Sequence, residues 1–239
     1  MRKWFLVITI SAIAGSYTLT GDDLQEDARF LIYTTYLQTA DFRLYWKDPE
    51  GKPYQSLGNL NAQLSKKKKT LLFAANAGMY RPDNSPQGLF IEEGKILAPL
   101  DTFNGKGNFY IKPNGIFYVD SLQHPYICTT EDFTYHTGIR YATQSGPVLV
   151  TNRKIHPAFN PRSANLNIRN GVGILPDERV VFIMSTEPVN FYDFAIAFRK
   201  TGCKEALYLD GFVSRTYLPE KQWIQTDGNF GVIIGITEK

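Results

Sequence analysis

The sequence predicts an α+β fold: a single domain with a mixed, largely antiparallel β-sheet and a few helices. Short apolar segments occur in pairs joined by polar turns, which is typical of antiparallel strands. Two stretches space their apolar residues as an amphipathic helix does. The 239 residues are 43% hydrophobic and 14% aromatic, which excludes a disordered chain and suffices for a substantial core.

Four hairpins are expected from the spacing of the apolar segments. The segments pair as 88–91 with 95–97, 108–112 with 116–119, 148–150 with 155, and 171–175 with 180–184. The turn Pro113-Asn114-Gly115 is a strong hairpin signal, because Asn-Gly tolerates the positive φ angles of a tight turn. Together the four hairpins predict extensive antiparallel pairing.

The first expected helix contains Leu57, Leu60 and Leu64, which fall on one helical face. It leads into the lysine run 66–69, whose positive charges favour the carboxyl end of a helix dipole. A solvated helix end accounts for this run more simply than a patch that binds polyanions.

The second expected helix begins after Asn190, a favourable N-cap residue, and ends at Gly202. Its apolar face consists of Phe191, Phe194, Ala195 and Phe198. An apolar strand follows over 205–209. This order places Asp210 at the carboxyl end of a strand.

Residues 1–14 have the layout of a secretory signal peptide, with Arg2 and Lys3, an apolar run over 4–10, and Ala12-Ile13-Ala14. The apolar run is shorter than the about 20 residues that span a bilayer, so no stable membrane insertion is expected after cleavage. An apolar N-terminal strand is the alternative interpretation. Export predicts a periplasmic or secreted protein whose mature chain, 15–239, is one domain.

The net charge is +3, from 26 basic and 23 acidic residues. Two of the basic residues, Arg2 and Lys3, belong to the expected leader, so that the mature chain has 24 basic and 23 acidic residues. A nucleic-acid-binding domain concentrates a much larger positive surplus. We therefore expect no nucleic-acid partner.

Common catalytic and cofactor-binding motifs are missing from the sequence. It contains no P-loop, dinucleotide fingerprint, Gly-x-Ser-x-Gly elbow or metalloprotease motif, and no cofactor is expected. Cys128 and Cys203 lack the Cys-x-x-Cys spacing of a metal site. Whether they pair in an oxidising compartment is left open.

Four turns rich in glycine and small polar residues are the candidates for a site, and each adjoins an apolar strand. They are 76–80 (NAGMY), 144–147 (QSGP), 169–173 (RNGVG) and 209–214 (LDGFVS). Glycine lets backbone amides approach a ligand closely, and concave clusters of amides bind anions. A single glycine after a strand usually marks only a turn, so the signal lies in the combination.

These turns, in this order, resemble the motifs of the bacterial phosphodiester glycosidase family, which is related to the mammalian uncovering enzyme. Further motifs carry the resemblance: Ser85-Pro86-Gln87-Gly88-Leu89, Gly107-Asn108-Phe109-Tyr110 and Ala206-Leu207-Tyr208. It covers roughly residues 70–237. The mammalian-like branch has two glycines where Phe212 and Val213 stand, and threonine at the position of Asn170. These departures concern the outer wall of the pocket and so the substrate.

The resemblance implies a hydrolase that cleaves between the anomeric carbon of a sugar and a phosphodiester, releasing the sugar. Asp210 would be its essential carboxylate, which stabilises an oxocarbenium ion, attacks as a nucleophile or activates water. Arg169 suits a phosphoryl group because its guanidinium donates two parallel hydrogen bonds. Asn76 completes the expected catalytic set. The expected substrate-binding residues are Gly78, Tyr80, Ser145, Gly146, Gly211 and Ser214.

No obvious second carboxylate accompanies Asp210, and a phosphate diester leaves readily enough that a strong general acid is less necessary. Glu187 and Asp83 are the candidates for one, outside the matched motifs. Whether a metal assists is left open.

Structural interpretations of the same residues also stay open. Asp210 can simply form a turn through its side chain, Arg169 can pair with a surface acid, and Asn76 can satisfy backbone groups at a strand end. His156 is interpreted as a loop residue. The competing function is a non-catalytic envelope protein that binds phosphorylated glycans.

Overall fold

The computed structural model describes residues 27–210 and 213–239; the expected signal peptide (1–14) and Gly211 lie outside these ranges. Its helices are α1 (Leu57–Lys66) and α2 (Phe191–Lys200), with 3₁₀ helices η1 (Asn108–Tyr110) and η2 (Pro219–Lys221). The strands are β1 (Phe30–Thr35), β2 (Asp41–Tyr45), β3 (Leu71–Asn76), β4 (Phe90–Glu92), β5 (Lys95–Ala98), β6 (Gly115–Asp120), β7 (Pro125–Thr129), β8 (Ile139–Ser145), β9 (Val148–Thr151), β10 (Lys154–Ile155), β11 (Asn170–Ile174), β12 (Val180–Ser185), β13 (Glu205–Tyr208), β14 (Thr216–Leu218), β15 (Trp223–Ile224) and β16 (Ile233–Thr237).

These strands form three sheets. The first has the order β1-β12-β11-β13-β9-β10, the second β15-β14-β3-β16-β2, and the third β5-β4-β8-β6-β7. Within the described ranges the paired strands run antiparallel. The predicted α+β class with largely antiparallel sheets is confirmed.

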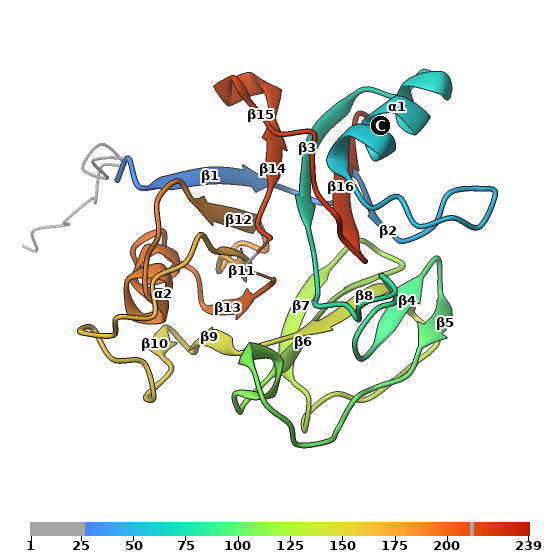
Figure 1. Ribbon diagram of the computed structural model, residues 1–239. Helices are drawn as coiled ribbons and strands as arrows, with labels where there is room; N and C mark the ends of the chain where they lie inside the picture. Colours follow the sequence, from blue (N-terminus) through green and yellow to red (C-terminus); the bar gives the residue numbers. More distant parts are fainter. Residues whose placement is uncertain (1–26, 211–212) are drawn as a thin grey trace, which may run out of the picture.

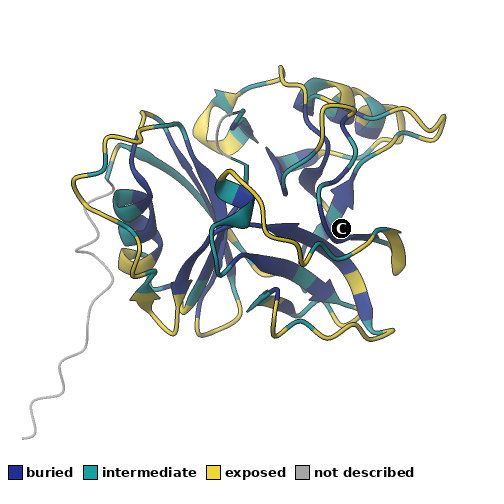
Figure 2. Cartoon of the chain, turned by 60° about the horizontal axis from the view of Figure 1, so that its bottom comes forward, coloured by how far each residue is buried: buried dark blue, intermediate teal, exposed yellow. Residues whose placement is uncertain are grey.

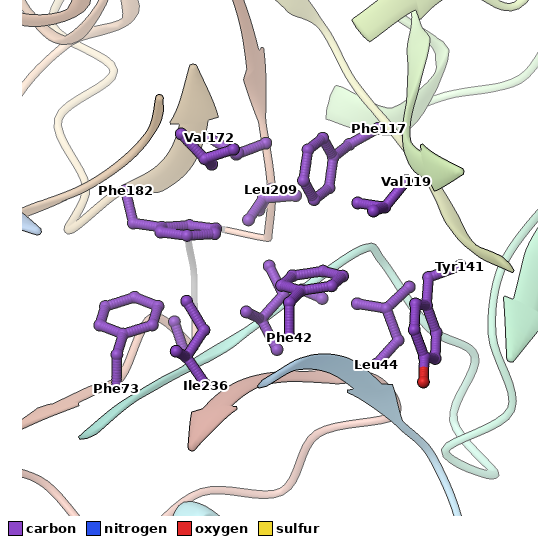
Figure 3. Packing of buried hydrophobic residues seen from close by; sticks show 14 of the residues in the cluster. Phe42, Leu44, Phe73, Phe117, Val119, Tyr141, Val172, Phe182, Leu209 and Ile236 are labelled. Atoms are coloured by element: carbon purple, nitrogen blue, oxygen red, sulfur yellow. The ribbon is translucent and has the colours of Figure 1, made fainter. Parts of the chain in front are cut away.

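The central core lies where the three sheets face one another (Figure 3). Phe182 from the first sheet stacks on Phe73 from the second, with ring centroids 4.7 Å apart, and meets the edge of Phe117 from the third at 6.5 Å. Alternation along β12 explains why both faces of the first sheet are buried: Val180 and Phe182 enter this core, whereas Val181 and Ile183 face the helix side.

Helix α2 covers the outer face of the first sheet (Figure 1). Asn190 caps it, because the Asn190 side chain accepts a hydrogen bond from the Asp193 amide at 2.8 Å. Phe198 packs so closely on β11 that a Cβ at Gly173 would stand 2.7 Å from its ring. Both the predicted bounds and the predicted apolar face of this helix are confirmed.

Helix α1 packs on the second sheet through Leu57, Leu60 and Leu64, which join a cluster with Phe230 and Ile233. The predicted helix is confirmed and ends at the lysine run. Within that run, Lys69 pairs with Asp41 at 2.6 Å, and the preceding lysines are exposed. Figure 2 shows that the strands are largely buried and that the exposed residues lie mostly in the loops.

Three of the four expected hairpins are confirmed: β4–β5, β9–β10 and β11–β12. The fourth, 108–112 with 116–119, is wrong. Residues 108–110 form η1, which buries Phe109, and the pairing partners of β6 are β7 and β8. Asn114-Gly115 therefore leads into β6 instead of turning a hairpin, because tertiary packing of Phe109 overrides the local turn signal.

Two further sequence questions are answered by the described residues. Cys128 and Cys203 are both free, with Cys203 buried. No described helix has the length and apolar character needed to cross a bilayer.

Candidate functional site

The four glycine-rich turns meet at one place, where β3, β8, β11 and β13 begin or end. The Asp210 amide donates to the carbonyl of Ala77 at 3.1 Å, and the Leu209 amide donates to the carbonyl of Asn170 at 3.1 Å. The Tyr208 amide donates to the carbonyl of Pro147, also at 3.1 Å. Backbone hydrogen bonds thus tie the segment before Asp210 to all three other turns.

Asn76 is the centre of a buried network of amides. Its Nδ2 donates to the carbonyl of Asp210 at 2.7 Å. Its Oδ1 accepts from the Arg215 amide at 3.0 Å and from Asn170 Nδ2 at 3.1 Å. Ser214 Oγ donates to the same carbonyl of Asp210 at 3.0 Å. The structure therefore brings Asn76, Asp210 and Ser214 together.

The glycines of the turns allow the sheets to approach one another here. A Cβ at Gly78 would stand 2.5 Å from the carbonyl oxygen of Gln144 and would also collide with Thr143 Oγ1. A Cβ at Gly146 would stand 2.6 Å from the Cβ of Asn114. Any side chain at Gly78 or Gly146 would push β3 or η1 away from β8.

Ser145 is completely buried at the end of β8, and its Oγ has no hydrogen-bond partner among the described residues. The preceding Gln144 uses its whole amide: Oε1 accepts from the amides of Leu89 and Asp101, and Nε2 donates to Asp101 and Thr130. Gln144 thereby holds the loop that contains η1 against β8.

Arg169 lies beside this network but on the other face of the first sheet, toward α2. Its side chain is completely buried; Nε donates to the carbonyl of Val189 at 2.8 Å and Nη1 to the Tyr208 hydroxyl at 3.2 Å. The guanidinium carbon lies 3.8 Å from the ring centre of Phe191, and Nη2 donates to the carbonyl of Asn165 at 2.9 Å.

A buried cation of this kind is costly without a negative partner. Among the described residues Arg169 forms no ion pair, so a salt bridge to a surface acid does not hold its side chain. Burial lowers the pKa of its guanidinium. Its contact with a phosphoryl group stays a prediction.

The hydroxyl of Tyr80 lies close enough to Asp210 for the negative charge of that carboxylate to change its pKa. Burial raises the pKa of the Tyr80 hydroxyl, and the negative charge of Asp210 raises it further. A protonated hydroxyl near the carboxylate is suited to hydrogen bonding with a sugar.

The two candidates for a second carboxylate are not part of this cluster. Asp83 accepts hydrogen bonds from the amide and the hydroxyl of Ser85 at 3.0 and 2.6 Å, and Glu187 is exposed ahead of α2. The residues described contain no group of three or more His, Cys, Asp or Glu side chains arranged for a metal ion.

Comparison with known proteins agrees with this geometry. The model of the phosphodiester glycosidase family matches residues 69–232, a stretch that contains all four turns. The chain belongs to this family. The resemblance seen in the motifs is thereby confirmed.

Relatives share the sequence and the fold to different degrees. The uncharacterized protein YigE of Escherichia coli (strain K12) is 34% identical over 222 residues, which cover 91% of this chain and 85% of that protein. The catalytic domain of zebrafish N-acetylglucosamine-1-phosphodiester alpha-N-acetylglucosaminidase, solved in a form auto-inhibited by its pro-peptide, has a TM-score of 0.56 at 12% identity, covering 88% of this chain and 89% of that one. A hypothetical protein from Synechocystis has a TM-score of 0.54 at 11% identity, covering 88% of this chain and 59% of that one. The last two show a common fold.

Two contacts in this cluster are not indicated by the sequence motifs. The amide of Asn170, which departs from threonine, donates to both oxygens of Asn76. The hydroxyl of Tyr208, a residue of the apolar strand, accepts from Arg169. The available signal was strand alternation: Arg169 and Asn170 must point to opposite faces of the sheet.

Proposed function

We propose that this protein is an exported hydrolase that cleaves the bond between the anomeric carbon of a sugar and a phosphodiester, with GlcNAc-1-phosphodiester-like substrates. Water adds to the anomeric carbon, the bond to the phosphate oxygen breaks, and the products are the free sugar and a phosphomonoester. The observation that carries the proposal is the convergence of the family's four turns on Asp210.

Asp210 is the reacting carboxylate in this proposal. It can stabilise the positive charge that develops at the anomeric carbon, attack that carbon, or take a proton from water. The departing phosphate is already anionic and needs little protonation, so one carboxylate suffices where ordinary glycosidases use two. Tyr80 and Ser145 supply hydroxyl groups for the sugar or the phosphate.

In this proposal a few individual groups, Arg169 and the backbone amides of the turns, attract the phosphate, and no basic surface is needed. Arg169 is a buried cation without an ion pair among the described residues, and the amides around Gly78 and Gly146 lie at the same strand ends. We assign phosphate binding to this region, where Arg169 contributes positive charge from the opposite face of the sheet.

The test is turnover of a series of GlcNAc-1-phosphodiesters by the purified protein, with free sugar as the readout. Asp210→Asn should lower kcat by about 100-fold or more, in the range lost when an acid–base group is removed. Asp177→Asn is the matched control, since Asp177 is exposed in the turn between β11 and β12 and its substitution should leave turnover unchanged. Full activity of Asp210→Asn would refute the assignment of Asp210.

The leader motivates a periplasmic or secreted location. Export predicts that the protein recovered from the periplasm or medium begins near residue 15, which mass spectrometry of the intact chain measures. Retention of residues 1–14 in a cytoplasmic fraction would contradict export.

The competing function is binding of phosphorylated glycans without chemistry, motivated by Phe212 and Val213 in place of glycines. Saturable binding of a phosphorylated glycan with no turnover, unchanged in Asp210→Asn, would favour it over hydrolysis.

A further inference from the structure

The turn that carries Asp210 is held at both ends by one side chain. Asn76 donates through Nδ2 to the carbonyl of Asp210 at 2.7 Å and accepts through Oδ1 from the amide of Arg215 at 3.0 Å. Ser214 adds a second donor to the same carbonyl of Asp210. The main chain before and after residues 211–213 is therefore fixed by Asn76, which is 1% exposed.

An asparagine amide is nearly symmetric in shape, so something must decide which end is the oxygen. Two backbone groups decide this, because the Arg215 amide can only donate to Oδ1 and the Asp210 carbonyl can only accept from Nδ2. Asn170 reinforces the same orientation: its Nδ2 donates to Asn76 Oδ1 at 3.1 Å and to the carbonyl of Asn76 at 2.7 Å. With donors from Asn170 and Arg215 both aimed at Oδ1, the Asn76 NH₂ group must face the carbonyl of Asp210. The opposite orientation would place donors against donors and two oxygens against each other.

Asn170 also holds the strand that leads into Asp210. Its carbonyl accepts from the Leu209 amide at 3.1 Å. Asn170 is 2% exposed, and its Oδ1 has no hydrogen-bond partner among the described residues. The side chain thus reaches Asp210 only through Asn76, and it acts entirely through its NH₂ group.

We propose that Asn170 is a positioning residue, which holds the end of β3 and the Asn76 amide in place through its NH₂ group and, through Asn76, fixes the main chain that carries Asp210. This rests on the proposed function only in taking Asp210 as the reacting group. The proposal also gives the departure from threonine a physical meaning: an amide NH₂ bonds both oxygens of Asn76, whereas a threonine hydroxyl has one hydrogen to donate.

Substitutions separate this role from mere packing. Asn170→Asp keeps the shape but replaces the donor with an oxygen facing Asn76 Oδ1. Asn170→Thr keeps one donor and should restore most of the function that Asn170→Ala loses. Ser214→Ala removes the second donor to Asp210 and should act in the same direction with a smaller effect. Ser56→Ala, which removes the N-cap of α1, controls for lost stability away from the site.

The experiment has two readouts, of which one does not require turnover. Hydrolysis of methyl GlcNAc-1-phosphodiester gives kcat and KM, and carboxyl-¹³C NMR of Asp-labelled protein, assigned with Asp210→Asn, gives the titration of Asp210. We expect Asn170→Asp and Asn170→Ala to lower kcat by about 10- to 100-fold, the range that a misplaced group costs, with KM changed less than about threefold. The titration of Asp210 should shift in both variants and stay unchanged in Ser56→Ala.

The two proposals fail in different ways. If the wild-type protein hydrolyses no sugar phosphodiester, the proposed function fails, and the NMR titration still decides the role of Asn170. If the folded Asn170 variants, or Ser214→Ala where they do not fold, leave both the Asp210 titration and kcat unchanged, the positioning role is overturned. Equal loss of activity in Ser56→Ala would overturn it as well.

Discussion

At the scale of single residues, the site depends on its glycines as much as on the charged residue Asp210. Gly78 follows Asn76 by two positions and lies directly against β8. The missing side chain lets the end of β3, with the Asn76 amide, come within reach of both Asp210 and Asn170. The charged group of the site is thus placed by neutral neighbours that the backbone brings together.

Gly78→Ala should therefore destabilise the fold by about 1–3 kcal/mol, the usual cost of forcing an extra group into a packed region. Its Cβ would meet the carbonyl of Gln144, which belongs to a paired strand and cannot rotate away. Urea denaturation measures the change. Gly51→Ala is the control, because a Cβ at Gly51 would have no atom within 4 Å and would add only the strain of φ +82°. Its loss of stability should therefore be smaller. Equal stability of Gly78→Ala and the wild type would contradict the close approach.

Much of the site could be predicted from the sequence because glycine and small polar residues at strand ends record where backbones meet. The turns that contain Asn76, Ser145 and Asp210 were found in this way, and they do converge. Strand alternation indicates only that Arg169 and Asn170 face opposite sides of the sheet; the stacking of Phe191 from α2 on the guanidinium of Arg169 was not predictable. The link between Asn170 and Asn76, 94 positions apart in sequence, is likewise a property of the folded sheets.

At the scale of secondary-structure elements, local patterns predicted both helices and the three short hairpins, whose partners are adjacent in sequence. They failed for 108–119, where Phe109 is buried in η1 and β6 pairs with the two strands that follow it, β7 and β8. The strands β2 and β16 were not predicted, because β16 pairs with β2 and β3, which lie at the other end of the chain. The periodicity of a segment does not indicate which distant strand it pairs with.

One strand carries a charge that the fold disfavours. Glu92, the last residue of β4, has a pKa raised to about 7, because burial disfavours the carboxylate and the neighbouring Glu93 adds negative charge. In the unfolded chain this group ionises near pH 4.5. The folded state therefore loses stability as the pH rises from about 4.5 to about 7, and the penalty is complete above that window.

Glu92→Gln should remove this penalty. The variant should unfold at higher urea than the wild type at pH 8, with a gain of about 1–3 kcal/mol after allowance for solvent screening, and should match the wild type near pH 4.5. Glu50→Gln, at an exposed position, should show no such dependence. A gain of equal size at both pH values would mean that Glu92 destabilises the strand for a reason other than its charge.

At the scale of the whole molecule, the three sheets have one common core, and the site stands at its edge. Phe182, Phe73 and Phe117 come from different sheets and touch in the centre (Figure 3). Leu209, directly before Asp210, belongs to the same core. The position of Asp210 is therefore coupled to the packing of all three sheets, and none of them is expected to unfold independently.

Phe182→Ala tests this coupling. Loss of a buried phenylalanine typically costs about 3–5 kcal/mol, and here the cavity would open between all three sheets. The control is Phe103→Ala, because Phe103 is 76% exposed and its loss should change stability by less than about 0.5 kcal/mol. Unfolding followed by far-ultraviolet circular dichroism should show one transition with its midpoint at lower urea, coincident with the transition followed by tryptophan fluorescence. Two separated transitions would show that the sheets unfold separately and that Asp210 depends on its own neighbours alone. A shift of the midpoint in Phe182→Ala no larger than in Phe103→Ala would contradict a core shared by the three sheets.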